Sequence, residues 1–165
     1  MILEILTHTP VWVFALFAYL AWIGIQRLRP SVRRISAVWI VPLFFIAWGL
    51  SGLFTREAPI APWLLGAVLG AALGAGFPQP VQIDRKRGLV RQAGSVVPLL
   101  RNLFLFASHY VLRVAMAIDP AMHSTLLAAD LAVSGFGAGY FAGWAIRFLI
   151  AWRRAPDVDL APAPA

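Results

Sequence analysis

The sequence predicts an all-α fold, a polytopic transmembrane helix bundle with five spans in a bacterial inner membrane. Three observations predict it. Of the 165 residues, 61% are hydrophobic and 13% are charged, about half the charged share of an ordinary soluble domain. Five apolar stretches approach the roughly 20 residues that a helix needs to cross a bilayer. Segments rich in Arg, Pro or Gly separate these stretches. Lipid must therefore cover apolar surface that water would not tolerate.

The spans together form one predicted domain, residues 1–154. Pro10 suits a first helical turn, where its missing N–H is not needed. Trp12 and Trp22 lie near opposite ends of the first span, as aromatic residues at membrane interfaces do. Asp119 and the proline after it end the fourth span. The predicted spans are 9–26, 35–54, 61–77, 96–118 and 125–152.

The loop between the third and fourth spans predicts a short β-hairpin. Residues 81–83 alternate in polarity, residues 84–88 are typical of a turn, and residues 89–92 resume the alternation. A lone hairpin is marginally stable in water, so this one would lean on the membrane surface or on a partner. After the last span, the Pro- and Ala-rich segment 155–165 is predicted to be disordered.

The distribution of basic residues predicts the orientation. With five spans, twelve of the 14 Lys and Arg residues fall on one side of the membrane, and Arg56 and Arg113 remain for the other. Because cytoplasmic loops carry the excess of Lys and Arg, the N-terminus is predicted outside and the C-terminus in the cytoplasm. These positions explain the net charge of +7 without nucleic acid as a partner.

Two spans carry glycines four residues apart, and each set would form a groove on one helix face. Helices in lipid associate through the close packing of such small residues. We therefore expect both faces to pack on neighbouring helices, or on each other. A homodimer seam and a thin wall beside a bound lipid are the alternatives. The glycines are Gly66, Gly70 and Gly74 in the third span, and Gly135, Gly139 and Gly143 in the fifth.

The fourth span has a polar stripe that is unsuited to face lipid. At about 100° per residue, its polar side chains fall within roughly 140° of one another. They are Arg101, Asn102, Ser108, His109 and Arg113.

Counting residues from the centre of the following turn brings partners from the fifth span to this stripe. Arg113 comes level with Asp130, and His109 with Ser134. One interpretation is a buried ion pair, Arg113 with Asp130, which fixes the register of the two helices. The other is a substrate or proton site, in which these residues and His109 line a small cavity open to the outside.

No motif identifies a reaction or a cofactor. The chain has no cysteine, which excludes disulfides, iron–sulfur clusters and Cys-ligated zinc. Phosphate loops, dinucleotide fingerprints and hydrolase elbows are absent from the sequence. His8 and His123 lack an evident third ligand, so no metal site is predicted.

Three classes of function follow. The favoured hypothesis is a membrane protein without enzymatic activity that acts through lipids, through a membrane-protein partner or as a homo-oligomer. The second is a small transporter or channel component whose path the polar stripe lines. The third is a membrane enzyme, for which His109 and Asp130 are the candidate residues.

The sequence of residues 5–12, 24–30, 83–91, 94–100 and 134–140 resembles an uncharacterised family of small polytopic bacterial inner-membrane proteins, a domain of unknown function. In that pattern Lys often precedes the tyrosine, where this chain has His109 before Tyr110. The resemblance implies a multi-pass architecture and no particular activity.

Overall fold

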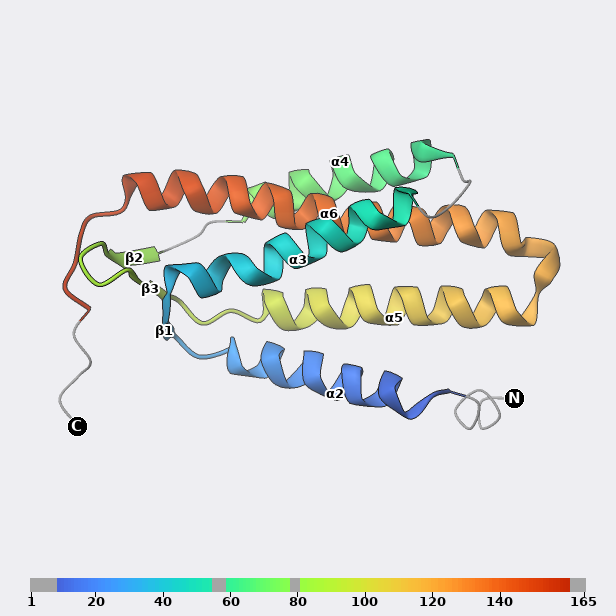
Figure 1. The fold of residues 1–165 in the computed structure, drawn as a ribbon, viewed down its shortest axis with the longest axis horizontal. Helices are drawn as coiled ribbons and strands as arrows, with labels where there is room; N and C mark the ends of the chain where they lie inside the picture. Colours follow the sequence, from blue (N-terminus) through green and yellow to red (C-terminus); the bar gives the residue numbers. More distant parts are fainter. Residues whose placement is uncertain (1–8, 55–58, 78–80, 161–165) are drawn as a thin grey trace. The chain divides into compact units, whose positions relative to one another are not determined.

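The computed structural model describes residues 9–54, 59–77 and 81–160 of the chain. These residues are mostly helical, with five α-helices, one short 3-10 helix and a three-stranded antiparallel sheet (Figure 1). The predicted helical class is therefore confirmed. Each predicted span boundary lies within two residues of a helix end. The helices are α2 Val11–Gln26, α3 Ile35–Phe54, α4 Ile60–Gly76, α5 Val97–Ile118 and α6 His123–Arg154.

By length and composition, one helical stretch of the described residues could cross a membrane, Pro120–Arg154. Val11–Gln26, Ile35–Ser51 and Ile60–Gly76 are apolar but shorter. A buried core helix of a soluble protein would pass the same test. Five membrane crossings therefore stay a prediction.

The chain divides into two compact units, and the division falls within α6. The first unit comprises residues 1–29 and 94–130, and the second comprises residues 30–93 and 131–165.

In the first unit, α2 and α5 pack against each other in antiparallel directions. The Oγ1 of Thr9 lies 2.7 Å from the hydroxyl of Tyr110. Further along, the rings of Phe17 and Phe106 lie 5.4 Å apart. At the far end, a Cβ added to Gly24 would lie 2.6 Å from a side-chain carbon of Leu99. Residues later in α2 therefore contact residues earlier in α5, as antiparallel helices require.

In the second unit, the two predicted glycine sets face each other, and α4 and α6 run parallel. A Cβ on Gly66 would meet the carbonyl oxygen of Ala132, and one on Gly74 would meet that of Tyr140. In return, a Cβ on Gly139 would meet the carbonyl oxygen of Ala67. Such backbone contact requires glycine on both helices. Gly70, Gly135 and Gly143 make equivalent contacts.

Helix α3 covers another side of α6 in the antiparallel direction. The rings of Phe45 and Phe141 stack with their centroids 4.8 Å apart. Gly49 lets Ala138 approach, because an added Cβ would lie 2.6 Å from the Ala138 methyl group. The indole N–H of Trp63 in α4 donates to the carbonyl of Gly49 at 3.1 Å. A hydrogen bond therefore joins α4 to α3 in this otherwise apolar core.

The sheet confirms the predicted hairpin and adds a strand that the sequence pattern did not indicate. The strands are β1 Ser31–Arg34, β2 Val81–Asp84 and β3 Leu89–Gln92, in the order β1-β3-β2. Gly88, at φ 63°, supplies the left-handed residue of the turn between β2 and β3. Ile83 and Val90 are buried against Phe148 and Val38. A third strand and a helical core thus support a hairpin that would be marginal alone.

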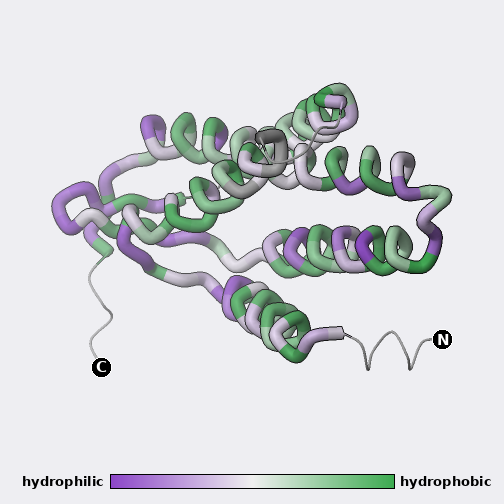
Figure 2. The backbone as a smooth tube through the Cα atoms, turned by 45° about the vertical axis from the view of Figure 1, so that its right-hand side comes forward, coloured by the Kyte–Doolittle hydropathy of each residue, from purple (hydrophilic) through white to green (hydrophobic). Residues whose placement is uncertain are grey.

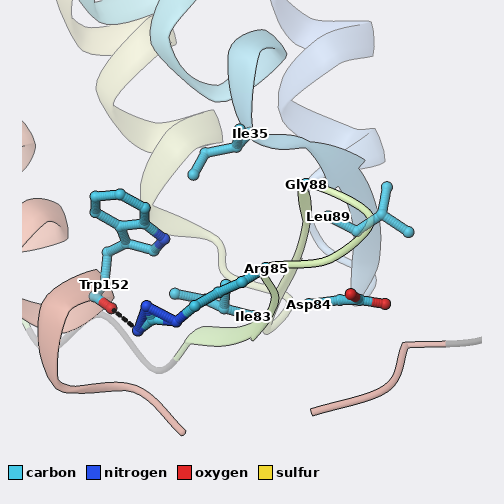
Figure 3. Close-up of a pocket in the computed structure, with 7 residues that line it drawn as sticks. All are labelled: Ile35, Ile83, Asp84, Arg85, Gly88, Leu89 and Trp152. Carbon is cyan, nitrogen blue, oxygen red and sulfur yellow. Dashed lines mark hydrogen bonds between the residues drawn. The ribbon is translucent and has the colours of Figure 1, made fainter. Parts of the chain in front are cut away.

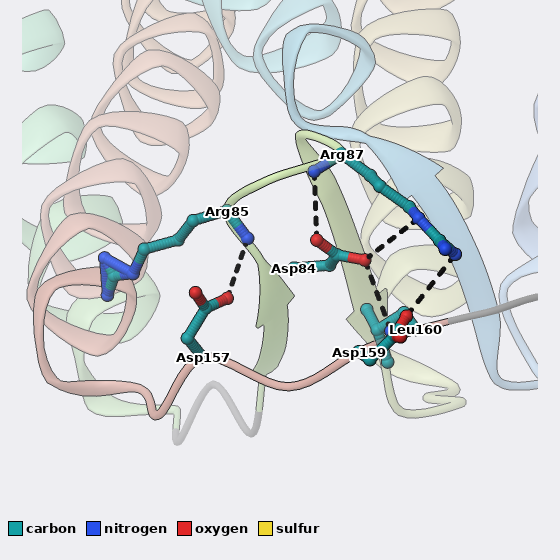
Figure 4. Close-up of polar contacts among 6 residues, drawn as sticks. All are labelled: Asp84, Arg85, Arg87, Asp157, Asp159 and Leu160. Atoms are coloured by element: carbon teal, nitrogen blue, oxygen red, sulfur yellow. Dashed lines mark hydrogen bonds and ion pairs between the residues drawn. The ribbon is translucent and has the colours of Figure 1, made fainter.

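The tail was predicted to be disordered from residue 155, and this is wrong for residues 155–160. Asp157 forms a parallel bridge with Ile83, and the N–H of Val158 donates to the Ile83 carbonyl at 2.8 Å. The side chain of Asp157 also accepts from the N–H of Arg85 at 2.9 Å (Figure 4). The exposed edge of β2 offers backbone partners that a Pro/Ala-rich composition does not reveal. Residues 161–165 lie outside the described residues.

Asp84 ties the hairpin turn to the tail. Its Oδ1 accepts from the N–H of Arg87 at 2.9 Å, and its Oδ2 accepts from the N–H of Leu160 at 3.3 Å (Figure 4). The Arg87 guanidinium also reaches Asp159 at 3.4 Å. The hydrogen bond from Arg87 lowers the pKa of Asp84 below its ordinary 3.8, with help from the Leu160 N–H and the Arg87 charge and against the effect of burial.

We expect Gly70→Ala to lower the free energy of unfolding by about 1–3 kcal/mol, the usual cost of overpacking. Its Cβ would fall on the carbonyl oxygen of Phe136. Denaturant unfolding in mild detergent, followed by circular dichroism, measures the change. Gly76→Ala is the matched control, because an added Cβ there meets no atom within 4 Å. Equal destabilisation by the two variants would contradict the close contact of α4 with α6.

We expect acid to weaken the attachment of the tail through Asp84. Because its pKa is lower in the folded state, the ionised carboxylate stabilises the fold above pH 3.8. This contribution is lost as the pH falls through the folded value. The difference in melting temperature between the wild type and Asp84→Asn should therefore shrink as the pH falls from 5 to below 3.8. A difference that stays constant over this range would contradict the role of the Asp84 carboxylate.

Candidate functional site

A sharp helical hairpin in the first unit brings the predicted polar residues together. Helix α5 ends at Ile118, and the 3-10 helix η1, Pro120–Met122, leads directly into α6. The carboxylate of Asp119 accepts from the N–H of Ala121 at 3.0 Å, which fixes the turn. With so short a connection, the last turns of α5 must lie beside the first turns of α6.

Asp130 is the centre of the site and is fully buried. Its Oδ1 lies 2.6 Å from Nδ1 of His109. Its Oδ2 accepts from Nη2 of Arg113 at 2.9 Å. Each carboxylate oxygen therefore has a partner from α5, as a buried charge requires.

The two partners of Asp130 are much more exposed than the carboxylate itself. The side chain of His109 is 38% exposed and that of Arg113 is 54% exposed, against 0% for Asp130. The side chains of His109 and Arg113 can therefore be hydrated without Asp130, whereas the buried carboxylate of Asp130 depends on its protein partners. This asymmetry makes Asp130 the residue whose charge the site must balance.

The geometry also orients the imidazole of His109. With an ionised Asp130 as the acceptor, Nδ1 carries the hydrogen and donates. Nε2, on the other side of the ring, has no hydrogen-bond partner among the described residues. A carboxylate–histidine pair of this kind can accept or pass a proton. No hydroxyl group in the described part of the chain forms a hydrogen bond with His109.

The other predicted members of the cluster lie elsewhere. Arg101 donates to the side-chain oxygen of the buried Asn102 at 3.0 Å, about two helical turns before His109. Ser134 belongs to the second unit, where its carbonyl oxygen lies beside Gly49. The contact that the structure shows for His109 is with Asp130, and the expected partnership of His109 with Ser134 stays a prediction. A buried carboxylate is a stronger acceptor than a hydroxyl group, and it attracts both donors.

Some contacts have no signal in the sequence. Thr9, just before α2, and Tyr110 of α5 are hydrogen-bonded although they are 101 residues apart. The placement of Arg85 beside Trp152 joins residues 67 apart. The pairing of Asp130 with Arg113 could be predicted by counting residues from the turn, because α5 and α6 are consecutive and joined by a short connection. No comparable count exists for distant segments.

Comparison with protein-family models, with curated proteins and with solved structures finds no match for this chain. The resemblance to an uncharacterised membrane family therefore stays a prediction. Function must be argued from the geometry of this chain alone.

We expect the double variant His109→Ala/Arg113→Ala to lose about 3–5 kcal/mol of stability, because it removes two partners of the fully buried Asp130 carboxylate. Asp130→Asn should cost less, about 1–3 kcal/mol, since its former partners can be hydrated. Denaturant unfolding in mild detergent measures both. His123→Ala, at an exposed histidine, is the control and should change stability by less than about 0.5 kcal/mol. A larger cost for Asp130→Asn than for the double variant would contradict the assigned asymmetry.

Proposed function

We propose that this chain is a multi-pass protein of the bacterial inner membrane, with five spans, that acts through lipid or protein partners and catalyses no reaction. The N-terminus lies outside and the C-terminus lies in the cytoplasm. The observation that carries the proposal is that α4 has a glycine face packed on α6 and an exposed apolar face.

One face of α4 consists of glycines in backbone contact with α6, and another face is apolar and exposed. Leu64, Leu65, Val68, Leu69 and Leu73 are 46–67% exposed. A soluble monomer rarely exposes a contiguous apolar surface of this kind. Hydrocarbon chains of lipid would cover it at no cost.

The directions of the packed helices support alternate crossing. Successive spans must alternate in direction, so the first and fourth spans must be antiparallel, as α2 and α5 are. The second and fifth must be antiparallel, as α3 and α6 are. The third and fifth must be parallel, as α4 and α6 are. All three relations agree with five crossings.

The lengths of the shorter helices, α2 and α4, agree with a thin bilayer. Helix α2 has 16 residues and α4 has 17, which correspond to about 24–26 Å at 1.5 Å per residue. The hydrocarbon core is about 30 Å thick. A mismatch of a few Å is accommodated by local thinning and by interfacial side chains, here Trp12 and Trp22, which are both exposed.

The basic end of the second unit supports the orientation. The hydrophilic stretches of this unit gather in β1, in the turn after β2 and at the end of α6, whereas its helices are largely hydrophobic (Figure 2). A cytoplasmic leaflet rich in anionic lipid attracts such a cluster by about 1 kcal/mol per charge. Its basic residues are Arg33, Arg34, Arg85, Lys86, Arg87, Arg91, Arg153 and Arg154.

A small transporter or channel component is the second candidate. The observation that favours it is Asp130, which is fully buried while its partners His109 and Arg113 are partly exposed. Ionisable groups within membrane spans frequently mark the path of a proton or a solute. The polar stripe of α5 would line that path.

Cysteine labelling tests the five-span topology, because the chain has no native cysteine. We expect a membrane-impermeant maleimide to label His123→Cys in intact spheroplasts, and to label Lys86→Cys after permeabilisation only. Both positions are exposed, so reactivity is matched. The reverse pattern would contradict the orientation. Labelling of both positions before permeabilisation, or extraction of the protein by alkaline carbonate, would contradict membrane crossing.

A further inference from the structure

A pocket of about 180 Å³ opens in the second unit, at its basic end (Figure 3). The first residue of α3, the β2–β3 hairpin and the last turn of α6 form its walls. Ile35, Ile83 and Leu89 make its lining mostly apolar. At about 30 Å³ for each water, the space suits a fragment of roughly headgroup size.

Trp152 leaves a hydrogen-bond donor without a partner at this pocket. Its Nε1 is the buried side-chain polar atom that has no hydrogen bond in the described part of the chain. Figure 3 shows this nitrogen on the side of the indole that faces the other lining residues. A buried donor without an acceptor costs free energy, so a ligand that brings an acceptor oxygen would bind favourably there.

Arg85 brings positive charge to the same place. Its Nη2 donates to the carbonyl oxygens of Trp152 at 3.0 Å and Ala155 at 3.2 Å, which holds the side chain at the end of α6. The guanidinium lies 5.8 Å from the centre of the Trp152 ring. Its Nη1 and Nε donors have no hydrogen-bond partner among the described residues. The guanidinium is therefore held in position and still able to bind an anion.

Asp84 also lines the pocket, but its negative charge is compensated elsewhere. Its two oxygens accept from the N–H groups of Arg87 and Leu160. Figure 3 shows its carboxylate directed away from the indole. The charge that the pocket presents to a ligand is consequently that of Arg85.

We propose that this pocket binds the glycerol-phosphate part of an anionic phospholipid. The indole N–H of Trp152 donates to a phosphate oxygen, and Arg85 balances the charge of the phosphate. The apolar lining contacts the methylene groups of the lipid, which a free phosphate ion lacks. The inference rests on the proposed function, because the lipid reaches this end of the unit from the cytoplasmic leaflet.

Native mass spectrometry of the full chain in mild detergent, titrated with phosphatidylglycerol, tests the assignment. We expect the wild type to retain one lipid and Trp152→Phe to bind it about tenfold more weakly, the usual effect of losing one hydrogen bond to a charged group. Arg85→Gln should weaken binding as well. The matched controls are Trp22→Phe, an exposed tryptophan of the other unit, and Arg91→Gln, an exposed cation of β3 outside the pocket. Circular dichroism melting confirms that each variant folds.

Wild-type affinity in Trp152→Phe would overturn the proposal. So would equal retention of phosphatidylcholine, or Trp152-dependent binding of glycerol 3-phosphate in place of the lipid. Failure of the proposed function gives a different result. If alkaline carbonate extracts the protein but it still binds short-chain phosphatidylglycerol through Trp152, the result contradicts the membrane topology and not the pocket assignment. If the protein resists carbonate extraction but retains no lipid, the result contradicts the lipid assignment of the pocket and not the membrane topology.

Discussion

The close parallel approach of α4 and α6 is the contact on which the second unit depends. Six glycines let each backbone touch carbonyl oxygens of the other helix, so that nothing but a hydrogen fits between them. In lipid, where burial of apolar surface against another helix gains little, such dispersion contacts hold helices together. Because both glycine faces are used in this contact, α6 is left with bulky residues, Phe141 and Phe148, toward α3 and the sheet.

The basic end of the second unit provides hydrogen-bond partners for backbone groups at the end of α6 and at the edge of β2. Arg85 donates to the carbonyl oxygens of Trp152, in the last turn of α6, and of Ala155, just after the helix. Asp157 and the backbone of Val158 cover the exposed edge of β2. The carboxylate of Asp84 accepts hydrogen bonds from the N–H of Arg87 in the β2–β3 turn and from the N–H of Leu160 in the tail. The only polar side-chain atom left buried and unpaired among the described residues is the indole nitrogen of Trp152, which is why that pocket stands out.

The first unit contains a buried carboxylate whose charge must be balanced by protein groups. Asp130 is buried completely, and His109 and Arg113 reach it from one side of α5. A structural role and a proton-handling role both require this arrangement, because each needs the carboxylate held and compensated. The imidazole nitrogen that faces away from Asp130 is the atom through which a proton would enter or leave.

The sequence by itself determined the helices, the hairpin and the glycine faces. These features follow from local periodicity and spacing, which the chain carries wherever it folds. It also indicated Arg113 and Asp130, since one short turn separates them. Only the tertiary structure decided the pairing of β1 with β3, the docking of residues 155–160 on β2, and the meeting of Arg85 with Trp152. These contacts join distant segments through backbone edges and single side chains, and no periodic pattern encodes which distant edge a strand will find.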